Sequence, residues 1–372
     1  MILDLQLFLH QHKNWRELLA AAPYCLTIKE DESLVLFKYN QYESDMTIQI
    51  CKEARGIIFD KNTLKPVCVP YFKFFNIEET DKADSIDWKS IVITEKIDGS
   101  LMKMFWYQNE WHLATNGTIN AFKAEVDSLN LTFGDLFVEA IGGINEYNKL
   151  KEHLSTDFCY MFELVHPKTQ IVIDYGKPQI YLHGVRNMAT LNEVDPFWFN
   201  VHENVKLPKL YPWVIAPDEL IKIVKNMINK EGIVVRDKDF HRVKIKSLDY
   251  LNKAFAYNYK NITIKRILKM WREDTLDDFL ALVPEKKDFV NNIFQKMKDY
   301  AEEQENYYCL LPDQYTMNRK DYYQLAIAQN NIDINYIMKK YDEKIRNPME
   351  YFENMGIKNI ERIISKCETL IE

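Results

Sequence analysis

A lysine, an aspartate and a glycine stand together in Thr94–Ser100, a segment that reads TEKIDGS and follows the apolar run Ile91–Ile93. A lysine amine is a nucleophile, and an enzyme that forms a covalent intermediate on it divides one difficult step into two easier ones. The same segment is also typical of an ordinary turn after a strand, because Asp98 and Gly99 are residue types that turns prefer. Taken alone, the segment leaves both interpretations open.

Further charged residues lie in short segments on both sides of Lys96. In chain order these are Cys51–Asp60 with Arg55, Tyr160–Val165 with Glu163, His183–Asn187, Glu231–Arg236, and Val243–Ser247 with Lys244 and Lys246. This ordered set resembles the signature of the covalent nucleotidyltransferases, which comprise ATP- and NAD-dependent DNA ligases, RNA ligases and mRNA capping enzymes. Each segment is weak evidence by itself, but the whole series in one order favours this superfamily.

Within this superfamily the chain most resembles the T-even bacteriophage RNA ligase 1 family. The resemblance covers roughly residues 30–250 and includes Phe37–Asn40, Lys73–Asn76 and Glu95–Leu101. It implies an ATP-dependent RNA ligase that works in three steps. A lysine attacks the α-phosphate of ATP to form lysyl-AMP with loss of pyrophosphate, AMP moves to the 5′-phosphate of an RNA, and a 3′-hydroxyl displaces AMP.

The resemblance also implies roles for individual residues. Lys96 is expected to be the nucleophile, Lys244 to contact the α-phosphate, and Lys246 to help activate Lys96 and orient the pyrophosphate. Glu163 is expected to contact ribose or a metal-bound water, and Glu231 to hold a divalent ion, Mg²⁺ or Mn²⁺. The expected nucleotide contacts are Tyr39, Arg55, Lys73, Glu95, Lys96, Asp98, Gly99, Glu163, Val185, Glu231, Lys244 and Lys246. The expected catalytic residues are Lys96, Lys244, Lys246 and Glu231, and the expected metal ligands are Glu163 and Glu231.

Elementary chemistry is consistent with these roles. An amine must be uncharged to attack, and neighbouring cations favour that form. The same cations would offset the charge that develops on phosphate in the transition state. The guanidinium of Arg55 suits ribose or a 5′-phosphate, because its planar fork binds phosphate through two hydrogen bonds. Glycine at positions 56 and 99 would let the backbone approach the nucleotide closely.

Val185 stands where many relatives of this kind have an aromatic residue against adenine. We therefore expect selection of the base to rest on apolar packing and backbone hydrogen bonds.

Plainer interpretations remain open for several of these residues. Lys244 and Lys246 fit one solvated face of a strand, because they lie two residues apart. A glutamate inside an apolar run is costly unless it is paired or bound to metal, but Arg186 or Arg236 could supply that pairing. Lys73 fits an exposed lysine, and Tyr39 fits a tyrosine of the core.

Other functions also remain to be weighed. A capping-type guanylyltransferase and a DNA ligase share the superfamily, but both continue into a β-rich oligonucleotide-binding barrel, and nothing after residue 255 predicts five strands. A catalytically silent RNA-binding relative would be expected to lose one of the charged residues of the site. The chain retains all of them, namely Lys96, Glu163, Glu231, Lys244 and Lys246.

Composition excludes several classes of protein. The 372 residues carry a formal charge of −7, 47% hydrophobic residues and no uncharged apolar run of the roughly 18 residues that a membrane helix needs. The six cysteines form no C-x-x-C pair, which disfavours a zinc site and is typical of reduced cytosolic thiols. We expect a cytosolic monomer whose partners are RNA with 5′-phosphate and 3′-hydroxyl ends, tRNA among the candidates, and a separate end-healing kinase or phosphatase.

The residues before about 250 predict short strands with helices between them. Strands are predicted at 34–37, 56–59, 101–106, 171–173, 180–185, 232–235 and 242–246, and helical periodicity occurs at 122–141 and 217–229. Because strands and helices do not alternate regularly, we expect an α+β fold with antiparallel sheets. The resemblance narrows this to the ATP-grasp-like nucleotidyltransferase domain of DNA and RNA ligases.

From about residue 255 the pattern becomes helical and poor in glycine. Apolar residues recur at helical spacing in 261–271, 275–282, 286–304, 318–329, 333–345 and 357–371. We expect a catalytic domain at 1–254 and an all-helical domain at 255–372, which resembles the small carboxy-terminal domain of the family in length and class. Substrate choice is expected to involve this second domain.

Overall fold

The structure, a computed structural model, describes residues 2–77, 86–126, 130–259, 262–272, 275–283, 286–329, 332–353 and 355–366. The chain divides into two compact units, one comprising Met1–Trp15 and Pro23–Tyr257, the other Arg16–Ala22 and Asn258–Glu372. This division lies inside helix α7 (Leu248–Tyr259), as does the predicted one at 254/255. The division of function between the two parts remains a prediction.

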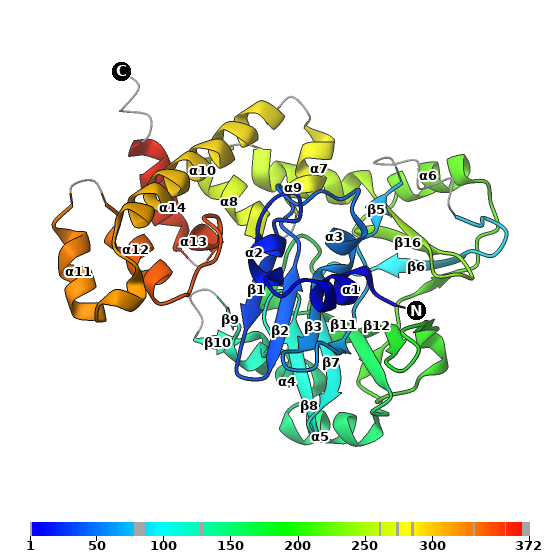
Figure 1. Cartoon of the computed structure of the whole chain (residues 1–372). Helices are drawn as coiled ribbons and strands as arrows, with labels where there is room; N and C mark the ends of the chain where they lie inside the picture. Colours follow the sequence, from blue (N-terminus) through cyan, green and yellow to red (C-terminus); the bar gives the residue numbers. More distant parts are fainter. Residues whose placement is uncertain are drawn as a thin grey trace. The chain divides into compact units, whose positions relative to one another are not determined.

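The described strands belong to the first unit and form mainly antiparallel sheets (Figure 1). One sheet has the order β1 (Thr27–Glu30), β2 (Leu34–Lys38), β3 (Arg55–Asp60), β4 (Pro66–Cys68). A second has the order β13 (Glu193–Val194), β12 (Gln179–Asn187), β11 (Phe158–Val165), β7 (Ser100–Tyr107), β8 (Glu110–Thr115), with β14 (Val205–Lys206) parallel to β12. A third has the order β15 (Leu210–Tyr211), β6 (Val92–Lys96), β16 (Gly232–Arg236), β17 (Arg242–Lys246), β5 (Phe75–Asn76), and β9 (Glu125–Val126) pairs with β10 (Leu131–Thr132).

Helices cover one face of the second sheet and one face of the third. The further helices of the first unit are α1 (Asp4–Gln11), α3 (Gln49–Glu53), α4 (Phe133–Ile141), α5 (Ile144–His153) and α6 (Pro217–Lys225). Leu136 and Leu150 of α4 and α5 join a buried cluster with alternate residues of β7, β11 and β12, such as Phe162. Leu220 of α6 joins a cluster with Ile233 and other residues of β6, β16 and β17. Each sheet therefore keeps a second face, to which the intervening residues point.

The described elements of the second unit are all helices, joined by turns and irregular segments. It contains all of α2 (Trp15–Ala20) except its first residue, together with α8 (Ile264–Arg272), α9 (Leu276–Leu282), α10 (Lys287–Leu310), α11 (Arg319–Ile327), α12 (Ile334–Tyr341), α13 (Glu350–Glu353) and α14 (Ile357–Lys366). Its core is aromatic: Trp271 packs edge-on against Phe294 with ring centroids 5.5 Å apart, and Tyr336 packs against Tyr351 at 5.1 Å. Among the described helices of the chain, none is long and apolar enough to cross a membrane.

The expectation of an α+β fold with antiparallel sheets is confirmed, while two predicted elements are wrong. Residues 171–173 form no strand, because the amides of Val172 and Ile173 donate to a side chain instead of a neighbouring strand. The helix predicted at 122–141 begins only at Phe133. Thr132 and Asp135 form a capping box there, in which each side chain accepts the other residue's backbone N–H.

Candidate active site

Lys96 and Lys246 flank a glycine in one row across the third sheet. Lys96 of β6 lies opposite Gly232 of β16, and Gly232 lies opposite Lys246 of β17. Directly opposed residues of paired strands project to the same face. The two lysines therefore point to the face not covered by α6, with no side chain between them.

Glu231 joins the two lysines. Its carboxylate accepts from Lys96 Nζ at 2.8 Å and lies 3.1 Å from Lys246 Nζ. The carboxylate is buried (side chain 3% exposed), whereas the Lys96 side chain is 22% exposed. Lys244, opposite Val234 and two residues before Lys246, lies on the same face and is nearly buried. The structure thus brings together the four expected catalytic residues.

Asp98 occupies the connection between β6 and β7 and is held by four hydrogen bonds. Its Oδ2 accepts the amides of Val172 at 2.9 Å and Ile173 at 2.8 Å, its Oδ1 accepts the Tyr250 hydroxyl at 3.1 Å, and its own amide donates to the Tyr175 hydroxyl at 2.8 Å. Burial, and then the charge of Glu231, raise the pKa of Asp98 to about 6. Asp98 is therefore a structural anchor beside the lysines.

Glu95 points away from these lysines. It precedes Lys96 in β6 and is buried, and its carboxylate pairs with Lys230 Nζ at 2.5 Å. The partner of Glu95 in the structure is therefore Lys230, the residue before Glu231. The expected contact of Glu95 with the nucleotide stays a prediction.

Glu163 lies on the second sheet, on the face opposite α4 and α5, and next to the Asp98 connection. A Cβ on Gly99 would lie 3.0 Å from Glu163 Cγ. Glu163 Oε2 is 3.1 Å from Nε2 of His183, whose ring stacks on Tyr71 with centroids 5.4 Å apart. The Tyr71 hydroxyl also donates to the His183 carbonyl. Tyr71 therefore holds both the ring and the backbone of His183.

Arg55 begins β3, where its guanidinium lies 5.1 Å from the centre of the Phe74 ring. Its Nη1 is buried and has no hydrogen-bond partner among the described residues. An unpartnered buried guanidinium nitrogen is costly, so this atom points to a ligand such as a phosphate or ribose oxygen.

Tyr39, which follows β2, lies beside Lys73, which precedes β5. Lys73 Nζ is 5.3 Å from the centre of the Tyr39 ring and 5.7 Å from that of Phe75. The segment that carries Lys73 continues into β5, where Asn76 pairs with Lys244 of β17. Lys73 thus lies just before the strand that pairs with Lys244, and Tyr39 lies beside Lys73.

Val185 is not at the site. It is fully buried in the cluster under α4 and α5, with Leu182. A β-bulge explains this position: Met161 pairs with Gly184 but Phe162 pairs with Leu182, so His183 is an extra residue and the alternation of faces shifts after it. The strand pattern alone would have left Val185 on the face of His183, and the bulge turns it away.

The two site glycines are required by the protein's own packing. A Cβ on Gly99 would lie 2.5 Å from the carbonyl oxygen of Leu164. Gly56 has φ +75°, and a Cβ there would meet the backbone of Asn116 and lie 2.8 Å from Lys103 Nζ. Neighbouring protein atoms therefore require glycine at both positions, and the expected close approach of the backbone to a nucleotide stays a prediction.

Sequence reasoning missed several supporting residues. Tyr175 and Tyr250 bind the Asp98 connection, Tyr71 and His183 hold Glu163, and buried Lys103 donates to the Gly56 carbonyl. Burial lowers the pKa of Lys103. Of these residues, Tyr250 could most easily have been predicted from the sequence, because it lies only four residues after Lys246, near the start of a helix. The others come from distant segments, and no local pattern marks them.

The alternative that Arg186 or Arg236 pairs with Glu163 or Glu231 is wrong, because both arginines pair with other carboxylates. Arg186 pairs with Glu193 at 2.8 Å, and Arg236 pairs with Asp195 at 2.8 Å. Neither arginine is thus the partner of Glu163 or Glu231.

The carboxylates of Glu163 and Glu231 offer hard oxygen ligands for a divalent ion. Among the described residues, Asp237, Asp239 and His241 form a group of three side chains close enough together to hold a metal ion, and this group lies in the turn after β16. The described residues around the lysine row form no such group of three. Mg²⁺ commonly binds through one or two carboxylates, waters and substrate phosphates rather than an all-protein cage. The donor set therefore fits an ion shared with a triphosphate.

A family model described as RNA ligase matches residues 53–261, which is more than half of the chain. The chain belongs to this family. The expected relationship to the T-even bacteriophage RNA ligase 1 family is thereby confirmed. The matched residues include Arg55, Lys96, Glu163, Glu231 and both lysines of β17.

Individual relatives bear related descriptions. A bifunctional polynucleotide kinase/RNA ligase of Autographa californica nuclear polyhedrosis virus is 29% identical over 277 residues, which are 70% of this chain and 39% of that protein. An RNA ligase of Rhodothermus phage RM378 is 27% identical over 286 residues, 64% of each chain. An archaeal ATP-dependent RNA ligase of known structure has 13% identity and a TM-score of 0.47 over 78% of this chain and 79% of that one. The match thus spans less than two thirds of the length of two of these relatives.

Proposed function

We propose that this chain is an ATP-dependent RNA ligase that joins RNA 5′-phosphate and 3′-hydroxyl ends through lysyl-AMP and RNA-adenylate intermediates. The observation that carries the proposal is that the carboxylate of Glu231 joins Lys96 and Lys246, the two lysines of the row, in a chain of the RNA ligase family. Lys96 is the partly exposed member of this row, and the buried carboxylate holds its amine in place.

In the first step Lys96 Nζ forms a bond to the α-phosphorus of ATP, the bond from that phosphorus to the bridging oxygen breaks, and pyrophosphate leaves. The amine must first lose a proton, because an ammonium has no lone pair. In the structure Lys96 donates to Glu231, so attack requires that this contact be released. Glu231 lies close enough to accept the proton.

Lys244, Lys246 and the unpartnered nitrogen of Arg55 are the cations that we assign to the phosphates. They are held by strands β17 and β3 before a nucleotide binds. Fixed positive charge stabilises the charge that develops on a transferring phosphoryl group without reorganisation during the reaction. We also assign Lys73, which lies beside Tyr39, to the same triphosphate.

We assign the divalent ion, Mg²⁺ or Mn²⁺, to Glu231 and Glu163. When bound, such an ion neutralises phosphate charge and orients the leaving pyrophosphate. Both carboxylates have nitrogen partners in the structure, Lys96 and Lys246 for Glu231 and the imidazole of His183 for Glu163. His183 and Lys246 then keep each carboxylate oriented while its remaining oxygen lone pairs bind the ion.

We further propose that the chain acts as a monomer in the cytosol on broken RNA, with tRNA as a candidate substrate. A separate kinase or phosphatase would then supply the 5′-phosphate and 3′-hydroxyl ends. The relative from Autographa californica nuclear polyhedrosis virus is described as a bifunctional polynucleotide kinase/RNA ligase, which favours this pairing of activities.

The proposal is tested with an RNA oligonucleotide that bears a 5′-phosphate and a 3′-hydroxyl, incubated with ATP and Mg²⁺. Wild-type protein should join the ends, and Lys96→Ala should not. Because Lys96 reacts only in the first step, Lys96→Ala should still seal an oligonucleotide supplied with AMP already on its 5′-phosphate. If wild-type protein leaves both substrates unjoined, the proposed activity is wrong.

The same assay separates the alternatives. A guanylyltransferase would label itself from GTP rather than ATP, and a DNA ligase would seal nicked DNA in preference to RNA. A silent relative would bind RNA and form no covalent nucleotide. We expect preference for ATP and for RNA.

A further inference from the structure

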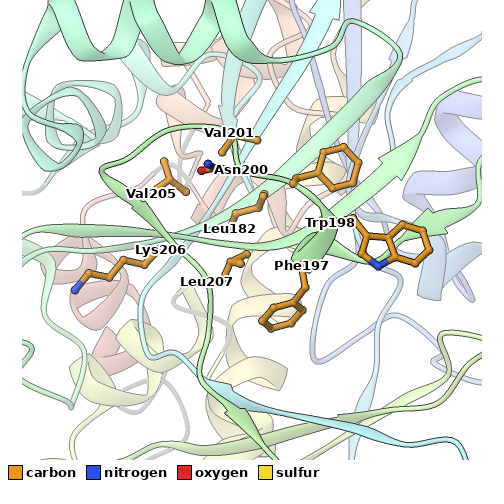
Figure 2. A pocket seen from close by; sticks show the side chains of 9 residues that line it. Leu182, Phe197, Trp198, Asn200, Val201, Val205, Lys206 and Leu207 are labelled. Atoms are coloured by element: carbon orange, nitrogen blue, oxygen red, sulfur yellow. The ribbon is translucent and has the colours of Figure 1, made fainter.

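A surface pocket of about 270 Å³ lies away from the lysine row, under the segment of residues 195–207, which follows β13 and includes β14. Leu182 of β12 forms its floor, and the segment supplies the remaining lining (Figure 2). These residues are Phe197, Trp198, Phe199, Asn200, Val201, Val205, Lys206 and Leu207. Leu182 belongs to the cluster under α4 and α5, so the pocket is on the opposite face of the second sheet from Glu163.

The segment that builds the pocket is fixed at several points. Asp195 accepts the Phe197 amide at 3.1 Å and pairs with Arg236 Nη2 at 2.8 Å. Phe199 packs edge-on against Phe158, with centroids 5.3 Å apart. Buried His202 lies 3.0 Å from a carboxylate oxygen of Glu146 in α5. A segment held in this way presents its side chains without a large loss of conformational freedom on binding.

Trp198 is 79% exposed in the middle of this fixed segment. No ring or cation of the described residues stacks on its indole. Phe197 is partly buried beside it, and the two aromatic side chains lie at one end of the pocket, with Lys206 at the other (Figure 2). An exposed tryptophan on a rigid scaffold is an open stacking surface.

The remaining polar groups fit a nucleotide. Lys206, whose amine also contacts Gln179 at 3.0 Å, is the one charged residue among the lining side chains, and it is cationic. Asn200 adds a carboxamide that both donates and accepts hydrogen bonds. Aromatic faces stack bases irrespective of sequence, amides bind base edges, and lysines bind the phosphate backbone. A small carboxylate would leave the Trp198 ring without a stacking partner, and a purely apolar ligand would leave Asn200 and Lys206 without polar partners.

We infer that this pocket binds one nucleotide of a single-stranded RNA substrate, with the base on Trp198 and a phosphate at Lys206. The inference rests on the proposed function, because it takes RNA as the substrate. Since Glu163 lies on the other face of the sheet, the bound nucleotide belongs to a part of the RNA away from the ends being joined. The pocket is thus a second contact to the RNA strand, separate from the site for ATP.

The test measures binding of a fluorescent single-stranded RNA that carries a 5′-hydroxyl and therefore cannot be ligated. Trp198→Ala should raise its Kd about tenfold, because stacking of one base is lost. Trp198→Phe should restore most of the affinity. Lys206→Glu should raise the Kd at low salt and lose that effect at high salt. Val214→Ala, which shortens a side chain that is 97% exposed in the same unit, should leave the Kd unchanged.

Oligonucleotides with one abasic position each provide the decisive comparison. Wild-type protein should bind one of them more weakly than the rest, and Trp198→Ala should remove that difference. Formation of lysyl-AMP, which needs no RNA, should be equal in all variants. A Kd for Trp198→Ala within twofold of wild type, with normal lysyl-AMP, would overturn the inference and point to a protein partner.

Failure of the proposed function gives a different result. In that case wild-type protein forms no lysyl-AMP, whereas the binding comparison between wild type and Trp198→Ala still decides whether the pocket holds RNA.

Discussion

Exposure distinguishes the lysines of the row. The side chain of Lys96 is 22% exposed, while that of Lys246 is 7% exposed and its amine lies 4.9 Å from the centre of the Tyr250 ring. A nucleophile must be reached by ATP, whereas a cation that stabilises charge acts best when water is excluded. The difference in exposure therefore supports the roles proposed for the two residues.

The pKa of Asp98 leads to a prediction about stability. Because burial raises this pKa to about 6 from the ordinary 3.8, the folded protein holds the proton more tightly than the unfolded chain. Stability contributed by the protonated form is present below about pH 4 and is lost as the pH rises through about 6. Between pH 5 and 7.5 the loss is about 1 kcal/mol.

Asp98→Asn should remove this dependence. The carboxamide can accept the amides of Val172 and Ile173 and donate to Tyr250, and it has no charge to bury. Urea unfolding at pH 5 and pH 7.5 should show a smaller fall in the free energy of unfolding for the variant than for wild type. Equal falls in both proteins would contradict the assignment to Asp98.

At the scale of elements, the site depends on how neighbouring strands are held in register. Glu193 of β13 bonds Arg186 of β12 at 2.8 Å and Arg242 of β17 through two bonds of 3.0 and 2.6 Å. It therefore joins the sheet of Glu163 to the sheet of the lysines.

Glu193→Gln should destabilise the protein by about 3 kcal/mol, because it leaves two largely buried arginines without their carboxylate. Glu110→Gln, at an exposed carboxylate beside His112, is the matched control and should change stability little. Chemical denaturation measures both. If the two variants lose similar stability, the buried carboxylate does not join the sheets in the way described.

Some elements of the fold could be predicted from the sequence and others could not. The alternation in Val243–Lys246 placed both lysines on one strand face correctly, because that strand pairs regularly on both sides. The face of Val185 could not be predicted, because it depends on a bulge set by the pairing with Met161 and Phe162. The segment 171–173 has the composition of a strand, but it binds Asp98, a residue more than seventy positions away.

At the scale of the whole molecule, the chain divides into two compact units. Lys96, Glu163, Glu231 and the lysines of β17 all lie in the first unit. We therefore expect lysyl-AMP formation to depend on the first unit and RNA choice to involve the second as well.

Phe294→Ala tests this separation. The substitution opens a cavity beside Trp271 in the core of the second unit and should cost that unit about 3 kcal/mol. Calorimetry should show one transition that moves to lower temperature and another that does not. At temperatures below both transitions, lysyl-AMP should form at the wild-type rate. A single transition that shifts as a whole would show that the units unfold together.

The central claim is that Lys96 is the residue that becomes joined to AMP. Wild-type protein incubated with α-labelled ATP and Mg²⁺ and then denatured should retain the label in an acid-labile, base-stable bond. Lys61→Ala, which removes a surface lysine with a side chain 28% exposed, should label like wild type, and Lys96→Ala should not label at all. Label on Lys96→Ala, or none on wild type, would contradict the claim.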